Sequence, residues 1–320
     1  MKKQSILFAL LILAIAATTA CGNSTSVPTF AKIAFLSNRT STPATRLFVA
    51  KLDGTNVTPV PNAPNGYSPS ISADFKKVAY QLNGNVFVGN VDGTGQAQLT
   101  TSNSSNFARI SPDGKKIVYS DNSAAFHLWI SNIDGTAKLD LTPSTLGSTG
   151  QCRAGGFSAD SSQVVMTCFD GNTNSFGMYT TKTDGTGVKT VIHSTNVSLD
   201  TPSFTPDGKK IVFFASGSLT AGASAGVVAF TPGIRHELQA RQKGLIIPTS
   251  GVTSINLDGT GATLLVPGSF ESVILNSTLY YTLRSGKFNQ IYKANVDGTN
   301  PVSISDGTSS DYLGQSQNVG

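Results

Sequence analysis

The sequence predicts an all-β fold, a six-bladed β-propeller whose blades are four-stranded antiparallel sheets. Three observations support this prediction: a recurring turn, alternating apolar residues around it, and almost no helical periodicity. The tripeptide Asp-Gly-Thr follows a short run of alternating apolar residues six times, at Asp53, Asp92, Asp134, Asp184, Asp258 and Asp297. A turn that recurs at intervals of 39, 42, 50, 74 and 39 residues is typical of a repeat protein.

A second recurring turn marks the hairpin that opens a repeat. The segment Ile110–Tyr119 (ISPDGKKIVY) reappears as Phe204–Phe213 (FTPDGKKIVF), with weaker copies at Ile71–Tyr80 and Phe157–Met166. Proline presets φ, aspartate caps the turn and glycine takes a positive φ, so the apolar runs on either side are predicted to be paired strands.

A third strand is expected before each Asp-Gly-Thr turn, and a weaker fourth strand after it. The predicted third strands are Leu47–Leu52, Val86–Val91, Leu128–Ile133, Met178–Thr183, Val252–Leu257 and Ile291–Val296. A lone four-stranded sheet cannot bury both of its faces, whereas six sheets arranged radially pack on their neighbours.

The two ends of the repeat region are expected to close the ring. The chain enters the first blade on a second-strand pattern, Lys32–Leu36, and the tail segment Ser309–Leu313 is predicted to supply the missing inner strand. Such an overlap removes the exposed sheet edges of an open ring. The alternative is that Val27–Phe30 supplies this strand and the tail is disordered.

Residues 1–20 have the pattern of a bacterial export signal. Lys2 and Lys3 precede the apolar run Ile6–Ala17, which is too short to span ~30 Å of hydrocarbon. Small residues followed by Cys21 and Gly22 resemble a lipobox, so we expect lipidation of Cys21 and a linker over residues 21–30. The alternative is an ordinary secretory signal. The lipid would be the one membrane attachment, on the periplasmic side of the outer membrane if the host is Gram-negative.

The charge of the chain argues against nucleic acid as a partner. Removal of residues 1–20 lowers the net charge from +5 to +3, and the lysines are spread over turns. Charged residues make up 13% of the sequence, against about 25% in typical proteins.

Cys152 and Cys168 are the cysteines that remain after Cys21. They lie at equal distances from Asp160, the centre of a predicted hairpin turn, and therefore face each other across two strands. In an oxidising compartment this placement predicts a disulfide, and the alternative is a pair of buried thiols.

One interval between turns is anomalously long and predicts an insertion at about residues 217–250, between the second and third strands of blade five. Segments Val227–Phe230 and Leu245–Ile247 are expected to pair as a hairpin. The stretch between them resembles a helix and carries the candidate binding residues Arg235, His236, Arg241 and Lys243. Long loops in compact domains are usually functional or disordered, so the insertion is either a partner-contacting flap or a tolerated surface addition.

The repeated motif, SPDGKKIVY followed by a strand, Asp-Gly-Thr and Leu-Thr, resembles the TolB-type (WD-like) β-propeller repeat from residue 31 to about 313. The resemblance implies the propeller fold and a cell-envelope location. TolB-type proteins carry an α/β domain before the propeller. About ten residues separate Cys21 from the first strand, so we expect that domain to be absent.

No catalytic, metal or cofactor motif stands out in the sequence. The one Gly-x-Ser-x-Gly spacing, Gly222–Gly226, lies at the start of the insertion, a stretch expected to be flexible, and not at a strand-to-helix elbow, and His236-Glu237 lacks the second histidine of a zinc motif. Asp170–Ser175 has oxygens at calcium-loop spacing but lacks the required glycine and glutamate. We therefore expect a non-enzymatic protein that binds an envelope protein, peptide or polymer through its loop face. The alternative is a lyase or hydrolase acting on a saccharide or lactone in the central channel.

Overall fold

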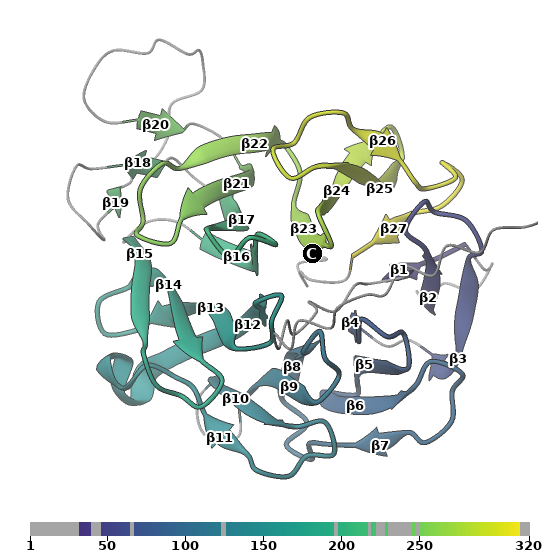
Figure 1. Ribbon diagram of the computed structural model, residues 1–320, viewed down its shortest axis with the longest axis horizontal. Helices are drawn as coiled ribbons and strands as arrows, with labels where there is room; N and C mark the ends of the chain where they lie inside the picture. Colours follow the sequence, from purple (N-terminus) through teal and green to yellow (C-terminus); the bar gives the residue numbers. More distant parts are fainter. Residues whose placement is uncertain are drawn as a thin grey trace, which may run out of the picture.

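The computed structural model shows a ring of six four-stranded antiparallel sheets, and this confirms the predicted fold (Figure 1). It describes residues 32–39, 46–64, 67–122, 126–194, 198–216, 219–221, 228–229, 245–247 and 250–313. The export signal, Cys21 and the linker lie outside these residues. No helix in the described part of the chain is long and apolar enough to cross a membrane.

The first three blades follow one another along the chain. Blade one contains β1 (Lys32–Ser37), β2 (Arg46–Lys51), β3 (Thr58–Pro64) and, from the far end of the chain, β27 (Asp311–Tyr312). Blade two contains β4 (Tyr67–Ile71), β5 (Lys77–Leu82), β6 (Asn85–Asn90) and β7 (Ala97–Gln98). Blade three contains β8 (Ser105–Ile110), β9 (Lys116–Asp121), β10 (His127–Asn132) and β11 (Leu139–Asp140), and a short 3₁₀ helix, η1 (Ser144–Thr149), follows it.

The other three blades complete the circle. Blade four contains β12 (Gly150–Phe157), β13 (Gln163–Asp170), β14 (Ser175–Lys182) and β15 (Lys189–Ser194). Blade five contains β16 (Ser198–Phe204), β17 (Lys210–Ser216), β21 (Gly251–Asn256) and β22 (Thr263–Pro267). Blade six contains β23 (Glu271–Leu275), β24 (Thr278–Ser285), β25 (Phe288–Asn295) and β26 (Val302–Ser303).

The hydrophobic core is divided into six clusters, and each cluster lies between two neighbouring blades. Between blades two and three, for example, Ala79 and Val86 pack against Ala108 and Ile117, all fully buried. Burial of a large apolar side chain contributes about 1.5–3 kcal/mol, so the ring is stabilised mainly by contacts between blades.

The six Asp-Gly-Thr turns share one hydrogen-bond pattern. In the first copy, Asp53 Oδ1 accepts hydrogen bonds from the Thr55 amide at 2.9 Å and the Thr55 hydroxyl at 2.6 Å. Gly54 takes φ +86°, which favours glycine. A seventh Asp-Gly-Thr, at Asp306, makes the same local bonds but precedes β27 and connects no third and fourth strand.

The ring closes through the tail of the chain, as predicted from Ser309–Leu313. Strand β27 pairs antiparallel with β1, so that Ser37 lies opposite Asp311 and Leu36 opposite Tyr312. The alternative, in which residues 27–30 supply the inner strand, is therefore wrong.

A small additional sheet belongs to the chain segment that connects the second and third strands of blade five. Strands β17 and β21 are partners, with Ala215 opposite Gly251, and residues 217–250 connect them. The expected direct pairing of Val227–Phe230 with Leu245–Ile247 is wrong. Instead β19 (Val228–Ala229) and β20 (Leu245–Ile247) lie on opposite sides of β18 (Leu219–Ala221), which takes both as partners.

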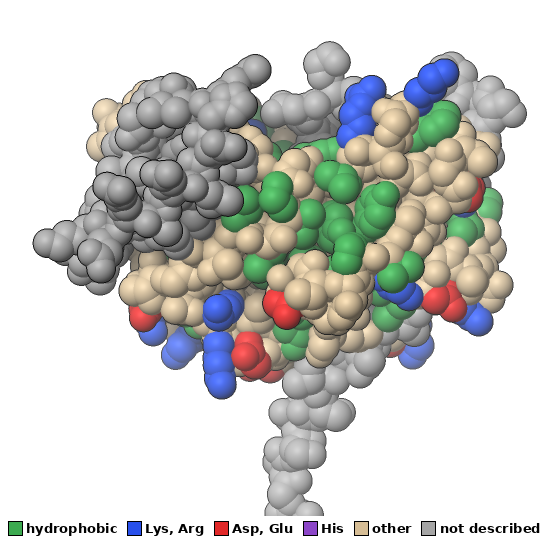
Figure 2. Space-filling view, turned by 90° about the horizontal axis from the view of Figure 1, so that it is seen from above, with side chains coloured by type: hydrophobic (Ala, Val, Ile, Leu, Met, Phe, Trp, Pro, Cys, Tyr) green, Lys and Arg blue, Asp and Glu red, His purple; other side chains and the backbone are tan. Residues whose placement is uncertain are grey.

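The outer wall of the ring over blades five and six is largely apolar at its middle (Figure 2). Val302 on β26 of blade six is 52% exposed, and Leu265, Leu283 and Tyr292 are partly buried against the cluster between blades five and six. Lysine, arginine and acidic side chains gather along the edges of this wall. Separate apolar side chains of this kind are ordinary on a protein surface.

Candidate ligand-binding site

The candidate site is a cavity of about 140 Å³ in the central channel of the ring. Every blade contributes to its wall. The apolar lining includes Ile71, Phe157 and Ile274 from inner strands, Leu313 directly after the inner strand β27, and Ile33 from β1, the second strand of blade one.

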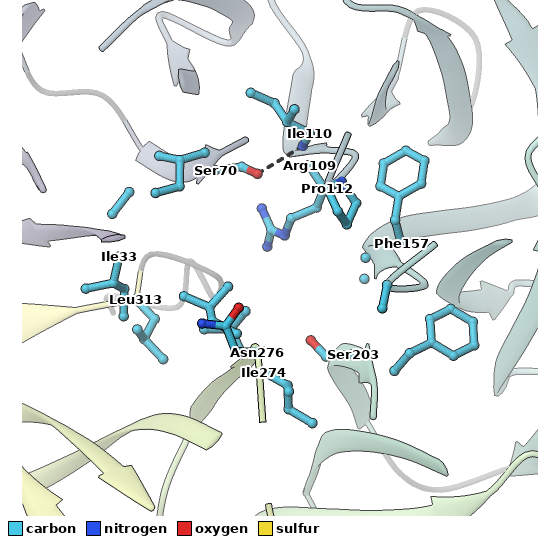
Figure 3. A pocket seen from close by; sticks show the side chains of 18 of the residues that line it. Ile33, Ser70, Arg109, Ile110, Pro112, Phe157, Ser203, Ile274, Asn276 and Leu313 are labelled. Carbon is cyan, nitrogen blue, oxygen red and sulfur yellow. Dashed lines mark hydrogen bonds between the residues drawn. The ribbon is translucent and has the colours of Figure 1, made fainter. Parts of the chain in front are cut away.

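Arg109 on β8 is the one ionisable side chain among the described residues that line the cavity. Its guanidinium extends toward the middle of the opening, with Ser203 and Asn276 on the far side (Figure 3). The residue is only 6% exposed. Its Nη1 donates to its neighbour's carbonyl, Ala108 O, at 2.7 Å, whereas its buried Nε has no hydrogen-bond partner.

Burial lowers the pKa of Arg109 to about 10, against the opposing effect of the nearby carboxylates Asp200 and Glu271. The guanidinium therefore remains protonated at neutral pH. No described carboxylate forms a salt bridge with it. Asp200 pairs instead with Arg153 at 3.3 Å, and burial raises the pKa of Asp200.

Glu271, the first residue of β23 in blade six, has hydrogen-bond partners of its own. Its Oε2 accepts hydrogen bonds from the Thr282 hydroxyl at 3.0 Å and from the Leu313 amide at 2.9 Å. These contacts fix the segment that follows β27, and Leu313 in turn lines the cavity. The carboxylate of Glu271 therefore joins ring closure to the wall of the site.

The cavity lies toward the turns that connect first and second strands. Its lining includes Pro112, Ala159, Pro206 and Asn276, all of which follow a first strand. The segment 217–250 connects a second strand to a third and therefore leaves from the opposite end of its blade. The end of β17 and the start of β21, where this segment attaches, consequently lie at the face of the ring opposite the cavity.

The candidate binding residues of the insertion lie outside the described residues. These are Arg235, His236, Arg241 and Lys243. Their role stays a prediction, as does lipidation of Cys21.

The repeat pattern of the sequence contains a signal for Arg109 that catalytic and metal-binding motifs do not reveal. It occupies the position two residues before the Ser or Thr of the hairpin turn. The other three copies of this turn have Ser70, Gly156 and Ser203 at that position. Blade three therefore has a charged residue at a channel-lining position where the other copies have Ser or Gly.

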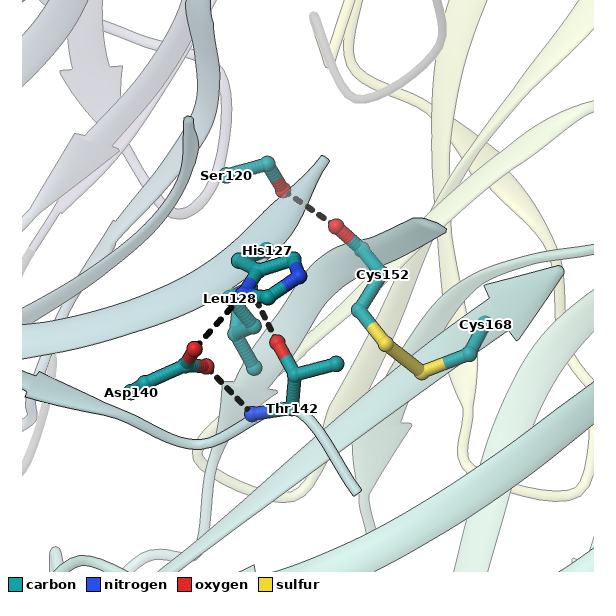
Figure 4. The surroundings of a disulfide bond; sticks show 7 residues. All are labelled: Ser120, His127, Leu128, Asp140, Thr142, Cys152 and Cys168. Atoms are coloured by element: carbon teal, nitrogen blue, oxygen red, sulfur yellow. Dashed lines mark hydrogen bonds and ion pairs between the residues drawn. A yellow bond between two sulfur atoms is a disulfide. The ribbon is translucent and has the colours of Figure 1, made fainter. Parts of the chain in front are cut away.

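Cys152 and Cys168 lie directly opposite each other on β12 and β13, and a disulfide joins them (Figure 4). Both residues are buried between blades three and four. Ser120 on the neighbouring blade donates a hydrogen bond to the Cys152 carbonyl at 2.8 Å. The pair therefore lies in the packing between blades, away from the cavity lining.

The histidines described do not meet at one site. His127 Nδ1 lies 2.6 Å from Asp140 Oδ2 on blade three, and His193 Nε2 lies 2.9 Å from Ser175 Oγ on blade four. Asp170 accepts hydrogen bonds from its own turn, from the Asn172 amide and the Thr173 hydroxyl. Within the described ranges, no group of three His, Cys, Asp or Glu residues is arranged to hold a metal ion.

Comparison of the sequence with family models and with curated proteins finds no match. The fold is nevertheless similar to many solved structures. TolB from Acinetobacter baumannii matches with a TM-score of 0.64 at 16% identity over 88% of this chain. This chain spans 65% of the length of that protein.

A TolB structure from Agrobacterium tumefaciens matches with a TM-score of 0.59 at 14% identity, covering 88% of this chain and 97% of that one. A chain of a nidogen/laminin complex matches with a TM-score of 0.59 at 11% identity, covering 89% of this chain and all of that one. Propellers of enzymes also match. At these identities the matches establish the fold, which is that of TolB-type β-propellers, and leave the ligand to the chemistry of the site.

Proposed function

We propose that this protein is a non-enzymatic propeller of the cell envelope that binds a protein, peptide or envelope polymer. The observation that carries the proposal is the lining of the central channel. General acid–base catalysis needs positioned groups that exchange protons near neutral pH. The described lining offers one arginine, which stays protonated, among apolar and neutral polar side chains.

A lyase or hydrolase in this channel would need carboxylates, histidines or a metal converging from several blades. Asp200 and Glu271 are the carboxylates that act electrostatically on Arg109. Both accept hydrogen bonds from other residues of the protein, Asp200 from Arg153 and Glu271 from Leu313. The similarity in fold to TolB structures supports an envelope binding role.

The location in the envelope rests on residues 1–20 and on Cys21, the proposed lipid attachment site. In a Gram-negative host this would be the periplasmic side of the outer membrane. Cys21→Ser should shift the protein from the membrane fraction to the soluble fraction. A protein that stays with the membrane after this change would refute the anchor.

The partner is best sought by crosslinking in intact cells, with mass spectrometry of the captured material. We expect a reproducible envelope partner for the wild-type chain. Deletion of residues 217–249 should leave the ring folded and weaken capture if the insertion is a flap. Turnover of a saccharide or lactone by the purified protein, without any captured partner, would contradict the proposed function.

A further inference from the structure

We infer that the central channel is a binding site for a small organic carboxylate, with Arg109 binding the carboxylate and the apolar wall holding its hydrocarbon part. This inference deepens the proposed function and rests on it only in treating the propeller as a binding protein. It assigns a ligand class to the channel, whichever face an envelope partner uses.

Arg109 is a buried cation without a salt-bridge partner among the described residues. Burying an ionised group is costly unless it is paired, and buried arginines are usually paired with carboxylates. Arg109 is 6% exposed, has one hydrogen bond to a neighbouring carbonyl, and has a buried Nε without a partner. A guanidinium has five N–H donors in a planar fork that matches a carboxylate. A bound carboxylate would therefore supply what the protein does not.

Two serine hydroxyls lie in the cavity wall with Arg109. Ser70 Oγ accepts a hydrogen bond from the Ile110 amide at 2.9 Å, which leaves the hydroxyl proton of Ser70 to be donated elsewhere. Ser203 also lines the cavity and points into it (Figure 3). These two hydroxyls, from blades two and five, are additional neutral donors for an anion at Arg109.

The size and polarity of the cavity also fit a small carboxylate. A cavity of about 140 Å³ has room for a carboxylate with a short branched hydrocarbon group. An apolar cavity of about 150 Å³ accommodates benzene in another protein. Ile33, Phe157, Ile274 and Leu313 offer apolar contacts for that group. One cation in an apolar wall suits a monoanion better than a phosphate, whose second charge would be left without a partner.

A carboxylate of this kind has two natural sources: a free short-chain acid, or the C-terminal residue of a peptide. The probes are therefore 3-methylbutanoate, its amide 3-methylbutanamide, and a short peptide ending in leucine with either a free or an amidated C-terminus. Binding is measured by calorimetry and by ligand-detected NMR on the purified chain, at ligand concentrations up to about 10 mM, tenfold above a Kd of about 1 mM.

We expect the free acid or the free-carboxylate peptide to bind and both amides to bind at least about tenfold more weakly. Tighter binding of the peptide would identify a chain terminus as the source, and equal binding would identify a free acid. Arg109→Met should abolish binding, whereas Arg284→Met, at an exposed arginine on blade six, should leave it unchanged.

Removing an unpaired buried charge should not unfold the ring, and Arg109→Met is expected to melt at or above the wild-type temperature. Arg109→Lys keeps the charge, loses the planar fork and should bind at least about tenfold more weakly than wild type. The inference is overturned if the amides bind as well as the acids, if Arg109→Met binds normally, or if no probe binds. A negative binding experiment would not affect the result of crosslinking in cells. Likewise, failure to capture a partner in cells would not affect the binding measured with the purified chain.

Discussion

Arg39 and Asp311 lie 272 positions apart in the sequence and form a partly buried ion pair that joins the two ends of the ring. Arg39 Nη2 lies 3.1 Å from Asp311 Oδ1 and 3.0 Å from Oδ2, and the Asp311 side chain is 1% exposed. The pair holds β27 against β1, together with a hydrogen bond from the Ser310 amide to Asn38 Oδ1 at 2.9 Å. Closure of the propeller therefore depends on charge as well as on strand pairing.

Asp311→Asn should destabilise the ring by about 2 kcal/mol, because it removes the buried carboxylate that accepts two hydrogen bonds from Arg39. Urea unfolding measures this change. The matched control is Asp306→Asn: Asp306 is 47% exposed and its Oδ2 lies 3.8 Å from Arg39 Nη1. Exposed pairs contribute up to about 1 kcal/mol, so equal losses from the two variants would contradict a closure role for Asp311.

Two adjacent glycines on β12 predict a sharp difference in tolerance. A Cβ at Gly155 would lie 2.3 Å from Pro202 Cγ and 2.5 Å from Pro202 O, whereas one at Gly156 would lie 3.8 Å from its nearest atom. Gly155→Ala should lower the free energy of unfolding by about 1–3 kcal/mol through overpacking between blades four and five. Gly156→Ala should have a much smaller effect. Thermal unfolding of both variants measures this difference, and a lower melting temperature for Gly156→Ala than for Gly155→Ala would contradict the prediction.

The disulfide between Cys152 and Cys168 closes a loop over a sequence separation of 16 residues. Replacing both cysteines with alanine should lower the free energy of unfolding by about 3 kcal/mol, chiefly because the unfolded chain gains freedom. Denaturation with and without reductant measures the loss, and peptide mapping without reductant should link the two residues. Recovery of two free thiols from native protein would contradict the bond.

The repeated turns predict how the carboxylates titrate. Hydrogen bonds from the threonine hydroxyl, and then from its amide, lower the pKa of Asp297 below its usual 3.8, as in the five equivalent turns. Because the folded pKa is depressed, these bonds contribute stability above pH 3.8 and lose it as the pH falls through the folded pKa.

Thr299→Val should therefore move the pKa of Asp297 back toward 3.8, since the variant lacks the hydroxyl that donates at 2.6 Å. Carboxyl-carbon NMR titration follows each aspartate separately. Asp258, in the neighbouring blade's turn, is the internal control and should not move. An unchanged Asp297 would show that the hydroxyl has no effect on its ionisation.

The sequence predicted much of the architecture because each repeat carries its own local signals. Pro-Asp-Gly and Asp-Gly-Thr fix turns through φ and short-range hydrogen bonds, so the strands around them could be located within a few residues. Ring closure by Ser309–Leu313 followed from a count of strands. These features depend on contacts close in sequence or on the need to pair every edge.

The channel site could not be derived in the same way. Its wall combines one or two positions from each of six blades, and the direction of the Arg109 side chain is set by packing. The pairing of β19 and β20 with β18 was missed because short apolar segments do not specify their partner. The one feature of this site that the sequence shows is Arg109, at a repeat position where the other copies have Ser or Gly.

The most direct test of the account is a crystal structure of the mature chain soaked with 3-methylbutanoate. We expect a closed six-bladed ring, with the carboxylate at hydrogen-bond distance, about 2.7–2.9 Å, from the Arg109 guanidinium and its methyl groups against the apolar wall. An open ring, or Arg109 paired with Asp200 or Glu271 of its own chain in an empty channel, would contradict it.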